Sequence, residues 1–177
     1  DNPAEIVNNY DWFKNINYID FMRDYGVHFN INKMLSSEIY NNRLENGGLT
    51  FFEMGYMPMQ AYDFVHLHKE YGCTLQYGGA DQWGNIAAGA ELQRKLNYVN
   101  GTNINLIGAT NPLLLTPEGK KMGKTEKGAI WLDKDKISAY DFYQGIYQTP
   151  DACVRMMFAL FTDINMKEID ALIAEDI

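Results

Sequence analysis

Residues 50–85 combine an amphipathic helix, a short strand and a glycine-containing turn, and this stretch constrains the fold most. Thr50 followed three residues later by Glu53 is a capping-box pattern, in which each side chain bonds to the other residue's backbone and starts a helix. Apolar residues then recur at helical spacing: Met54, Met57, Ala61, Phe64 and Leu67. The pattern predicts a helix whose apolar stripe packs against a core.

A polar flank lies beside that stripe. Tyr56, Gln60 and Asp63 are spaced by four and then three residues, so a phenol, an amide and a carboxylate line up along one side of the helix. Pro58 removes one backbone donor and predicts a kink or a restart of the helix. Such polar residues are usually only the solvated face of a helix, and that structural interpretation stays open on the residues alone.

A strand, a glycine turn and a helix start follow. Residues 73–77 are predicted as a short buried strand, Gly78 and Gly79 as a tight turn, and the next helix begins near Asp81. Open α/β sheets bind ligands at such a junction, because backbone N–H groups and the helix dipole converge there. Gln82 lies at the same place. The simpler alternative is an ordinary turn without a ligand.

Residues 116–127, TPEGKKMGKTEK, form a loop rich in glycine and lysine. By itself this loop is typical of a solvated hairpin. Lys121 and Lys124, followed by Thr125, could also close on the charge that develops as a pyrophosphate group leaves. The loop does not fit the G-x-x-x-x-G-K-[ST] pattern of a Walker A loop.

Taken together, these three motifs resemble those of the bacterial-type tyrosyl-tRNA synthetases, a family of class I aminoacyl-tRNA synthetases. Residues 56–63 (YMPMQAYD) resemble the family's tyrosine-binding helix, residues 78–85 (GGADQWGN) its adenylate-side turn, and residues 121–125 (KMGKT) its mobile ATP loop of the KMSKS type. The resemblance covers nearly the whole chain. The three motifs in this order and spacing are far more specific than any one of them.

The resemblance implies a role for each motif residue. The tyrosine-binding residues would be Asp63 for the phenol, Tyr56 and Gln60 for the α-amino group, Gln82 for the carboxylate and Gln76 beside the pocket. The ATP and adenylate would be bound by Gly79, Asp81, Lys121 and Lys124. The catalytic residues would be Lys121, Lys124 and Thr125 of the mobile loop.

The activity implied by the resemblance is that of a tyrosine–tRNA ligase. L-Tyrosine would be activated by ATP to tyrosyl-adenylate and then transferred to the tRNA for tyrosine, with Mg²⁺ on the ATP phosphates. The protein would be a cytoplasmic homodimer that acts in protein biosynthesis, without a membrane partner. The closest alternative is the tryptophanyl type of class I synthetase, and a second one is a non-catalytic dimerisation or binding module.

Composition narrows the class of protein. The net charge of −8 argues against this segment being the main nucleic-acid surface, since phosphate binding needs clustered Lys and Arg. Cys73 and Cys153 lie far apart, which favours a reduced protein over a disulfide framework or a zinc site. His66 and His68 point to different faces of a helix, so no protein metal site is predicted. No apolar run is long enough to span a membrane.

Further helix and strand signals surround the central stretch. Helices are predicted at Tyr18–Tyr25, after a cap at Asn30 or Asn32, after a cap at Ser36 or Ser37, at Trp83–Val99, and after Ser138, Pro150 and Asn165. The small residues at 87–90 are expected to let their helix lie close on a sheet, and residues 103–109 are predicted as its second strand.

We therefore expect an α/β fold: a partial Rossmann-like catalytic core with a dimer-interface segment at 1–115, a mobile ATP-phosphate loop at 116–128, and the start of an α-helical, anticodon-side domain at 129–177. The chain is expected to be truncated at both ends, because the family's ATP motif with two histidines would precede Asp1 and because the sequence stops within a helical pattern at Ile177. The chain alone is therefore expected to be inactive.

Overall fold

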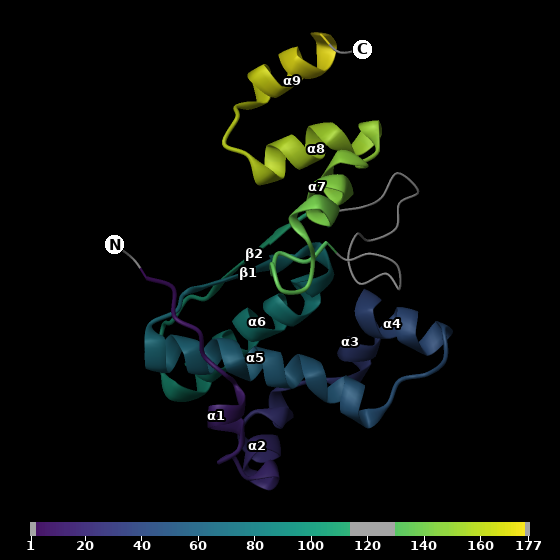
Figure 1. Cartoon of the computed structure of the whole chain (residues 1–177). Coiled ribbons are helices and arrows are strands. Elements are labelled where there is room, and N and C mark those ends of the chain that lie inside the picture. Colours follow the sequence, from purple (N-terminus) through teal and green to yellow (C-terminus); the bar gives the residue numbers. More distant parts are fainter. Residues whose placement is uncertain (1–2, 114–129, 176–177) are drawn as a thin grey trace. The chain divides into compact units, whose positions relative to one another are not determined.

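The structure is a computed structural model that describes residues 3–113 and 130–175, in two units that divide between Pro112 and Leu113. Figure 1 shows the elements of the first unit: α1 (Tyr10–Phe13), α2 (Tyr18–Asp24), η1 (Gly26–His28), α3 (Ile31–Leu35), α4 (Glu38–Glu45), α5 (Phe51–Tyr71), β1 (Leu75–Gly79), η2 (Ala80–Gln82), α6 (Trp83–Asn100) and β2 (Ile107–Asn111). The second unit contains α7 (Ala139–Tyr147), α8 (Asp151–Phe161) and α9 (Met166–Glu175). The predicted division into a catalytic core at 1–115, an ATP-phosphate loop at 116–128 and an anticodon-side domain at 129–177 stays a prediction.

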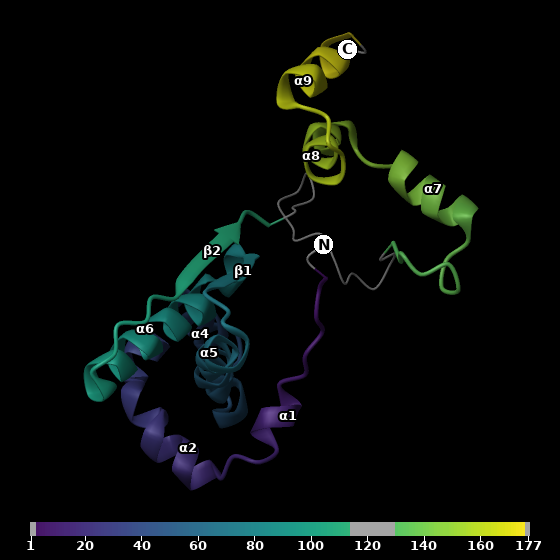
Figure 2. The ribbon, with the colours of Figure 1, turned by 90° about the vertical axis from the view of Figure 1, so that its left-hand side faces the viewer.

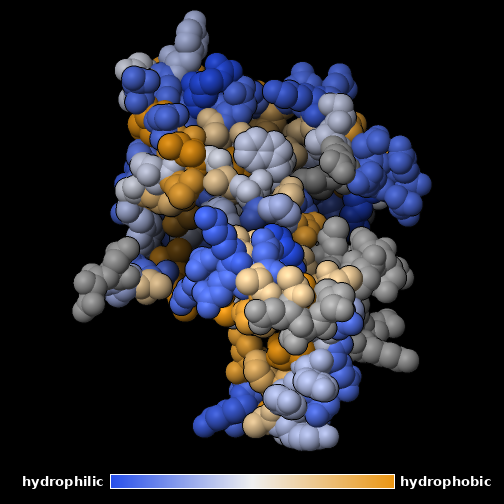
Figure 3. Space-filling view, turned by 90° about the horizontal axis from the view of Figure 1, so that it is seen from above, coloured by the Kyte–Doolittle hydropathy of each residue, from blue (hydrophilic) through white to orange (hydrophobic). Residues whose placement is uncertain are grey.

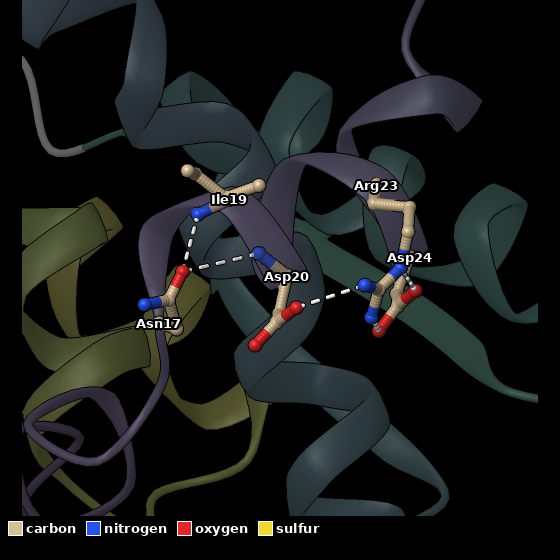
Figure 4. Close-up of polar contacts among 5 residues, drawn as sticks. All are labelled: Asn17, Ile19, Asp20, Arg23 and Asp24. Carbon is tan, nitrogen blue, oxygen red and sulfur yellow. Dashed lines mark hydrogen bonds and ion pairs between the residues drawn. The ribbon is translucent and has the colours of Figure 1, made fainter.

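Helix α2 starts at an asparagine cap. The side chain of Asn17 accepts hydrogen bonds from the backbone N–H groups of Ile19, at 2.9 Å, and Asp20, at 3.4 Å (Figure 4). Arg23 forms ion pairs with Asp20 and Asp24 along the same helix. These ion pairs are exposed and add little stability, so the cap is the stronger local signal. The helix ends at Asp24, one residue earlier than predicted.

The next two helices begin differently. Asn30 caps α3 by accepting a hydrogen bond from the Lys33 N–H, which decides between the two predicted asparagine caps. Ser37 occupies the N-cap position of α4 but makes no cap hydrogen bond. Its hydroxyl donates instead to the Met34 carbonyl at 2.6 Å. The serine marks the right boundary but does not cap it.

Helix α5 confirms the capping box. The Thr50 hydroxyl accepts from the Glu53 N–H at 3.2 Å, and the Glu53 carboxylate accepts from the Thr50 N–H at 3.0 Å. The helix runs unbroken through Pro58, so the predicted restart there is wrong. It ends at Gly72, which adopts the left-handed conformation (φ 69°) that favours glycine. Its buried residues belong to the predicted stripe: Met57, Ala61 and Phe64.

Strands β1 and β2 form a parallel pair whose register runs from Leu75 opposite Ile107 to Gly79 opposite Asn111. The prediction for β1 was shifted by two residues, because both glycines belong to the strand rather than to a turn. It was also wrong about burial, since Leu75 is 52% exposed within this chain. The helix that follows is preceded by the short η2 turn.

Strand β2 begins later than its predicted start at residue 103, and Asn97 of α6 supplies the reason. The Asn97 amide donates to the Ile104 carbonyl at 2.7 Å and its oxygen accepts from the Ile104 N–H at 3.2 Å. The same oxygen accepts from the Thr102 hydroxyl at 2.8 Å. Because the side chain of Asn97 already satisfies this backbone, the ladder forms only from Ile107 onward.

Helix α6 contacts both the strand pair and α5, and the two helices lie side by side in Figure 1 and Figure 2. Ile86 packs against the strands at glycines: a Cβ at Gly108 would lie 2.6 Å from its Cγ2. The predicted contact of small residues with the sheet is wrong for Gly89, which faces α5. A Cβ there would lie 3.0 Å from Phe64. Glycines on the strands, rather than on the helix, bring α6 close to the sheet.

The second unit is helical, and its predicted caps are confirmed. The Ser138 hydroxyl accepts from the Asp141 N–H at 3.0 Å and starts α7, α8 begins after Pro150, and Asn165 accepts from the Glu168 N–H at 3.1 Å before α9. Helices α8 and α9 pack together around Cys153 and Ile169, which are 4% and 0% exposed.

Large hydrophobic side chains also reach the surface, and Figure 3 shows hydrophobic residues in orange among hydrophilic ones in blue on the face that it depicts. Within residues 3–113 and 130–175, no helix combines the length and the apolar character needed to cross a bilayer.

Candidate active site

Three of the five predicted tyrosine-binding residues, Tyr56, Gln60 and Asp63, lie on α5. Tyr56 is 62% exposed, whereas Gln60 and Asp63 are half-buried. Their spacing places them along one flank of a continuous helix, next to the stripe that ends in the buried Phe64. The helix therefore presents a phenol, an amide and a carboxylate together, as predicted, while their roles stay a prediction.

The Asp63 carboxylate is held by two donors from the N-terminal segment, which passes α5 in Figure 1. Trp12 Nε1 donates to Oδ1 at 2.8 Å, and Asn9 Nδ2 donates to Oδ2 at 3.2 Å. Burial raises the pKa of the Asp63 carboxyl, and these two hydrogen bonds, with His66 nearby, oppose that rise. The two donors fix the direction of the carboxylate and favour its charged form.

Aromatic rings fix this N-terminal segment on α5. Trp12 stacks on His66 with ring centroids 4.4 Å apart. Tyr62 lies next to Asp63 on α5, and its ring contacts Phe13 at 5.4 Å and Tyr25 at 4.7 Å between centroids. Burial is the main cause that raises the pKa of Tyr62 to about 12, so its hydroxyl stays neutral. The cluster makes the donors of Asp63 part of a packed unit.

The sequence interpretation missed Asn9 and Trp12 as parts of the site. The one available signal was chemical: both side chains are N–H donors, and a half-buried carboxylate needs donors. Their separation from Asp63 by 54 and 51 residues hides the pairing from any local pattern.

The strand end carries the second group of predicted residues. Gln76 lies on β1 opposite Gly108, and its side-chain oxygen is buried without a hydrogen-bond partner within the described part of the chain. A buried amide oxygen of this kind is satisfied when a donor from a ligand or a water reaches it. Gly79 ends β1 at φ −69°, an ordinary conformation, so its value to a ligand is close backbone approach rather than a special turn.

A chain of amides leads from the turn into α6. The Gln82 amide donates to the Asp81 carboxylate at 3.5 Å, and the Asn85 amide donates to the Gln82 oxygen at 3.3 Å. Asp81 is exposed, Gln82 is half-buried and Asn85 is buried. Asn85 thus anchors Gln82, which in turn touches the exposed carboxylate. Sequence patterns placed Asp81 and Gln82 at this junction but gave Asn85 no role.

The three predicted catalytic residues, Lys121, Lys124 and Thr125, lie outside the described residues. Their roles on the ATP phosphates stay predictions. What the structure describes is therefore the acceptor and amide side of the predicted site, on α5, β1 and the η2–α6 junction.

Comparison with known proteins decides the family. Residues 1–176 match the family model described as tRNA synthetases class I (W and Y). The chain belongs to this family. Its parallel strand pair, with α6 packed against both strands, is part of the Rossmann-like α/β core of class I synthetases, so the predicted fold class is confirmed.

Relatives within the class I family are similar over nearly the whole chain. The tyrosine–tRNA ligase of Wolbachia pipientis subsp. Culex pipiens is 51% identical over 170 residues, which cover 96% of this chain and 39% of the relative. That of Clostridium kluyveri is 50% identical over 172 residues, which cover 97% and 41%. The chain therefore spans about two-fifths of the length of these curated relatives.

A solved structure of a tyrosyl-tRNA synthetase has a fold similar to that of this chain. The C-terminally truncated mitochondrial tyrosyl-tRNA synthetase of Coccidioides posadasii matches with a TM-score of 0.75 and 30% identity, over 95% of this chain and 47% of that one. The similarity to tyrosyl-tRNA synthetases predicted from the three motifs is thus confirmed at the levels of sequence and fold.

Proposed function

We propose that the protein containing this chain is a tyrosine–tRNA ligase that converts L-tyrosine and ATP to tyrosyl-adenylate and passes the tyrosyl group to its tRNA. The observation that carries the proposal is the Asp63 carboxylate, half-buried on α5 and oriented by Trp12 and Asn9. A fixed charged acceptor of this kind suits a phenol hydroxyl. Curated relatives about 50% identical bear the name tyrosine–tRNA ligase, which supports the same choice.

The remaining residues complete the proposed substrate site. Tyr56 and Gln60 bind the α-amino group of tyrosine, Gln82 orients its carboxylate, and Gln76 offers its buried oxygen beside the substrate. Asp81 and the Gly79 backbone bind the adenylate. Lys121, Lys124 and Thr125 bind the ATP phosphates, and Mg²⁺ enters with ATP as part of that substrate.

The proposed mechanism needs no covalent enzyme intermediate. The carboxylate oxygen of tyrosine attacks the α-phosphorus of ATP, the bond from that phosphorus to the bridging oxygen breaks, and pyrophosphate leaves. A ribose hydroxyl of the tRNA then attacks the carbonyl carbon, and AMP leaves. The protein contributes positioning and stabilisation of charge at the phosphates, which are the usual means of catalysis in phosphoryl chemistry.

The first prediction tests the phenol contact. In the full-length protein, Asp63→Ala should lower the preference for tyrosine over phenylalanine by about 100-fold, because the charged partner of the hydroxyl is lost. The preference is measured as the ratio of the two kcat/KM values in ATP–pyrophosphate exchange. Glu70→Ala, at an exposed position on the same helix, is the control and should leave the ratio unchanged. An unchanged ratio in Asp63→Ala would remove Asp63 from the site.

Tryptophan is the rival substrate, since the family model covers both the W and Y enzymes. An indole carries one N–H donor and no hydroxyl. A carboxylate can accept a hydrogen bond from either group, so the names of the relatives are needed beside it. The names of the relatives favour tyrosine. Exchange measured with each amino acid separately decides between them, and stimulation by tryptophan alone would overturn the proposal.

We also propose that the protein is a homodimer that contacts its partner through an apolar groove between α2 and the start of α5. The groove has a volume of about 310 Å³, and Phe21 and Met22 of α2 and Phe51 and Met59 of α5 line it. Phe51 is 67% exposed in the single chain, which is unusual for so large an apolar ring beside other apolar groups.

The second prediction concerns this groove. Phe51→Asp should shift the full-length protein from dimer to monomer, because a charge would have to be buried at the centre of the contact. Sedimentation at several protein concentrations measures the shift. The control is Ile6→Asp, at an exposed site near the N-terminus that does not line the groove. A wild-type protein that is monomeric at micromolar concentration would contradict the proposal.

We also propose that the protein binds the tRNA for tyrosine and acts in the cytoplasm. The net charge of −8 places most of the expected phosphate contacts on other parts of the protein or on a small local patch.

A further inference from the structure

Pro58 leaves an unusual gap in the backbone hydrogen bonding of α5. The residue lies inside the helix, as its eighth residue, and it has no N–H group. In an α-helix the N–H of residue 58 would donate to the carbonyl of Met54, four residues earlier. The proline ring also crowds that carbonyl. Met54 therefore needs a donor from elsewhere, because a carbonyl enclosed by protein is costly to leave unpaired.

Tyr40 of α4 supplies that donor. Its hydroxyl donates to the Met54 carbonyl at 2.9 Å, and the same oxygen accepts from the Met57 N–H at 3.4 Å. The hydroxyl thus bridges two backbone groups within the turn of α5 that precedes Pro58. Figure 1 shows α4 beside the N-terminal half of α5, as these bonds require.

The bridge is enclosed by apolar side chains. Tyr40 is 3% exposed and forms a buried cluster with Met34 and Met57, against which Leu49 and Ala88 pack. Burial raises the pKa of the Tyr40 hydroxyl, with the Met57 amide opposing the rise, so the group keeps its proton and remains a donor.

The gap lies within the proposed tyrosine-binding face. Tyr56 precedes Pro58 by two residues, whereas Gln60 and Asp63 follow it. The geometry of the helix around Pro58 sets the position of Tyr56 relative to the other two side chains. A group that fixes the turn before Pro58 therefore fixes where Tyr56 lies relative to Gln60 and Asp63.

We propose that Tyr40 is a positioning residue for tyrosine binding, which fixes the turn of α5 that carries Tyr56 by giving the Met54 carbonyl the hydrogen bond that Pro58 removes. The inference rests on the proposed function, because it treats Tyr56, Gln60 and Asp63 as one substrate-binding face. Tyr40 itself does not touch the substrate. Its effect passes through the backbone of Met54 and Met57.

The chain offers a matched test in which the missing donor is restored. Tyr40→Phe removes only the hydroxyl and keeps the ring, whereas Pro58→Ala gives α5 back its own N–H for the Met54 carbonyl. In the full-length protein, Tyr40→Phe should raise the KM for tyrosine by about tenfold, the size expected when a buried carbonyl loses its partner, with the KM for ATP nearly unchanged. In the Pro58→Ala background, the same substitution should raise the KM for tyrosine less than twofold.

This double-mutant cycle separates positioning from general loss of stability. A structural role alone would lower the melting temperature and leave the KM for tyrosine of the folded enzyme unchanged, which would overturn the inference. Equal effects of Tyr40→Phe in both backgrounds would also overturn it, because the hydroxyl would then not be compensating for Pro58. An active wild-type enzyme is the reference for both results. Absence of tyrosine-dependent exchange in wild type would instead contradict the proposed function, and the positioning role with it.

Hydrogen exchange gives a second measurement, which does not depend on catalysis. The amides of residues 57 and 59–62 should exchange faster in Tyr40→Phe than in wild type, and Pro58→Ala should restore their protection. Unchanged protection in Tyr40→Phe would show that the hydroxyl does not hold this turn, and the inference would fail.

Discussion

At the scale of single residues, the state of Asp63 depends on groups far away in the sequence. Burial favours the protonated form, while the N–H groups of Trp12 and Asn9 favour the charged form. A charged carboxylate is what the proposed phenol contact requires. Partial burial of the charged Asp63 carboxylate therefore costs stability, and the two hydrogen bonds reduce that cost. Such perturbed carboxylates are common at binding sites.

The third prediction removes one of these donors. Because the pKa of Asp63 is raised in the folded protein, its charge costs stability at pH values above the folded pKa, and this cost disappears as the pH falls through that pKa. Trp12→Phe keeps a stacking ring but removes the Nε1 donor, so the pKa of Asp63 should rise further. At pH 7 the free energy of unfolding should fall by about 1 kcal/mol, at the low end for a charged hydrogen bond because Asp63 is partly exposed.

Urea unfolding at pH 7 and at mildly acidic pH measures the effect. The loss in Trp12→Phe should shrink on acidification, since protonated Asp63 needs the donor less. The same substitution made together with Asp63→Asn is the control, and its effect should be independent of pH. A loss that does not change with pH in the Asp63 background would mean that Trp12 stabilises through packing alone.

At the scale of elements, local patterns predicted what is encoded locally. The capping box at Thr50 and Glu53, the apolar stripe of α5 and the caps at Ser138 and Asn165 depend on residues within one or two turns of each other, and all are confirmed. The flank with Asp63 was predictable for the same reason. The sequence could not show which contacts form between one element and another.

Two errors follow from that limit. The strand after Thr102 was predicted too early because Asn97 binds the Ile104 backbone from a neighbouring helix, and no local propensity encodes this. Gly78 and Gly79 were taken as a turn, although the close approach of Ile86 is what requires small residues on the strands. Tertiary contact overrode the local meaning of glycine.

The fourth prediction tests helix packing at Gly89. A Cβ at this position would lie 3.0 and 3.1 Å from atoms of Phe64, whose side chain is fully buried. Gly89→Ala should therefore lower the free energy of unfolding by at least about 1 kcal/mol, despite the better helix propensity of alanine, because overpacking forces α5 and α6 apart.

Gly55 of α5 provides the matched control, since a Cβ there would meet no heavy atom within 4 Å. Gly55→Ala should stabilise by about 0.5–1 kcal/mol through helix propensity alone. Both variants are compared by denaturant unfolding at the same protein concentration. Stabilisation of similar size in both would mean that α6 has room to move away from Phe64 at no cost.

At the scale of the whole molecule, the described residues supply one side of the proposed site. Asp63, Gln76 and Gln82 come from three elements of the first unit, and the predicted phosphate lysines lie outside the described residues. The chain spans about two-fifths of its curated relatives. The activity proposed for the protein therefore need not reside in these 177 residues.

The fifth prediction is that the 177-residue chain alone does not form tyrosyl-adenylate, although the full-length protein does. None of its three histidines begins a nucleotide-binding turn: His28 ends the η1 turn, and His66 and His68 lie within α5. Large apolar groups such as Leu75 and Ile107 on the strand pair are also half exposed in the single chain, whereas the faces of parallel sheets are normally covered. Tyrosine-dependent ATP–pyrophosphate exchange should therefore be absent from the purified chain and present in the full-length protein.

Co-expression of the chain with the separate N-terminal segment of the full-length protein should restore exchange if that segment supplies the missing half of the ATP site. Clear exchange by the purified chain alone would show that these residues already contain a complete ATP site.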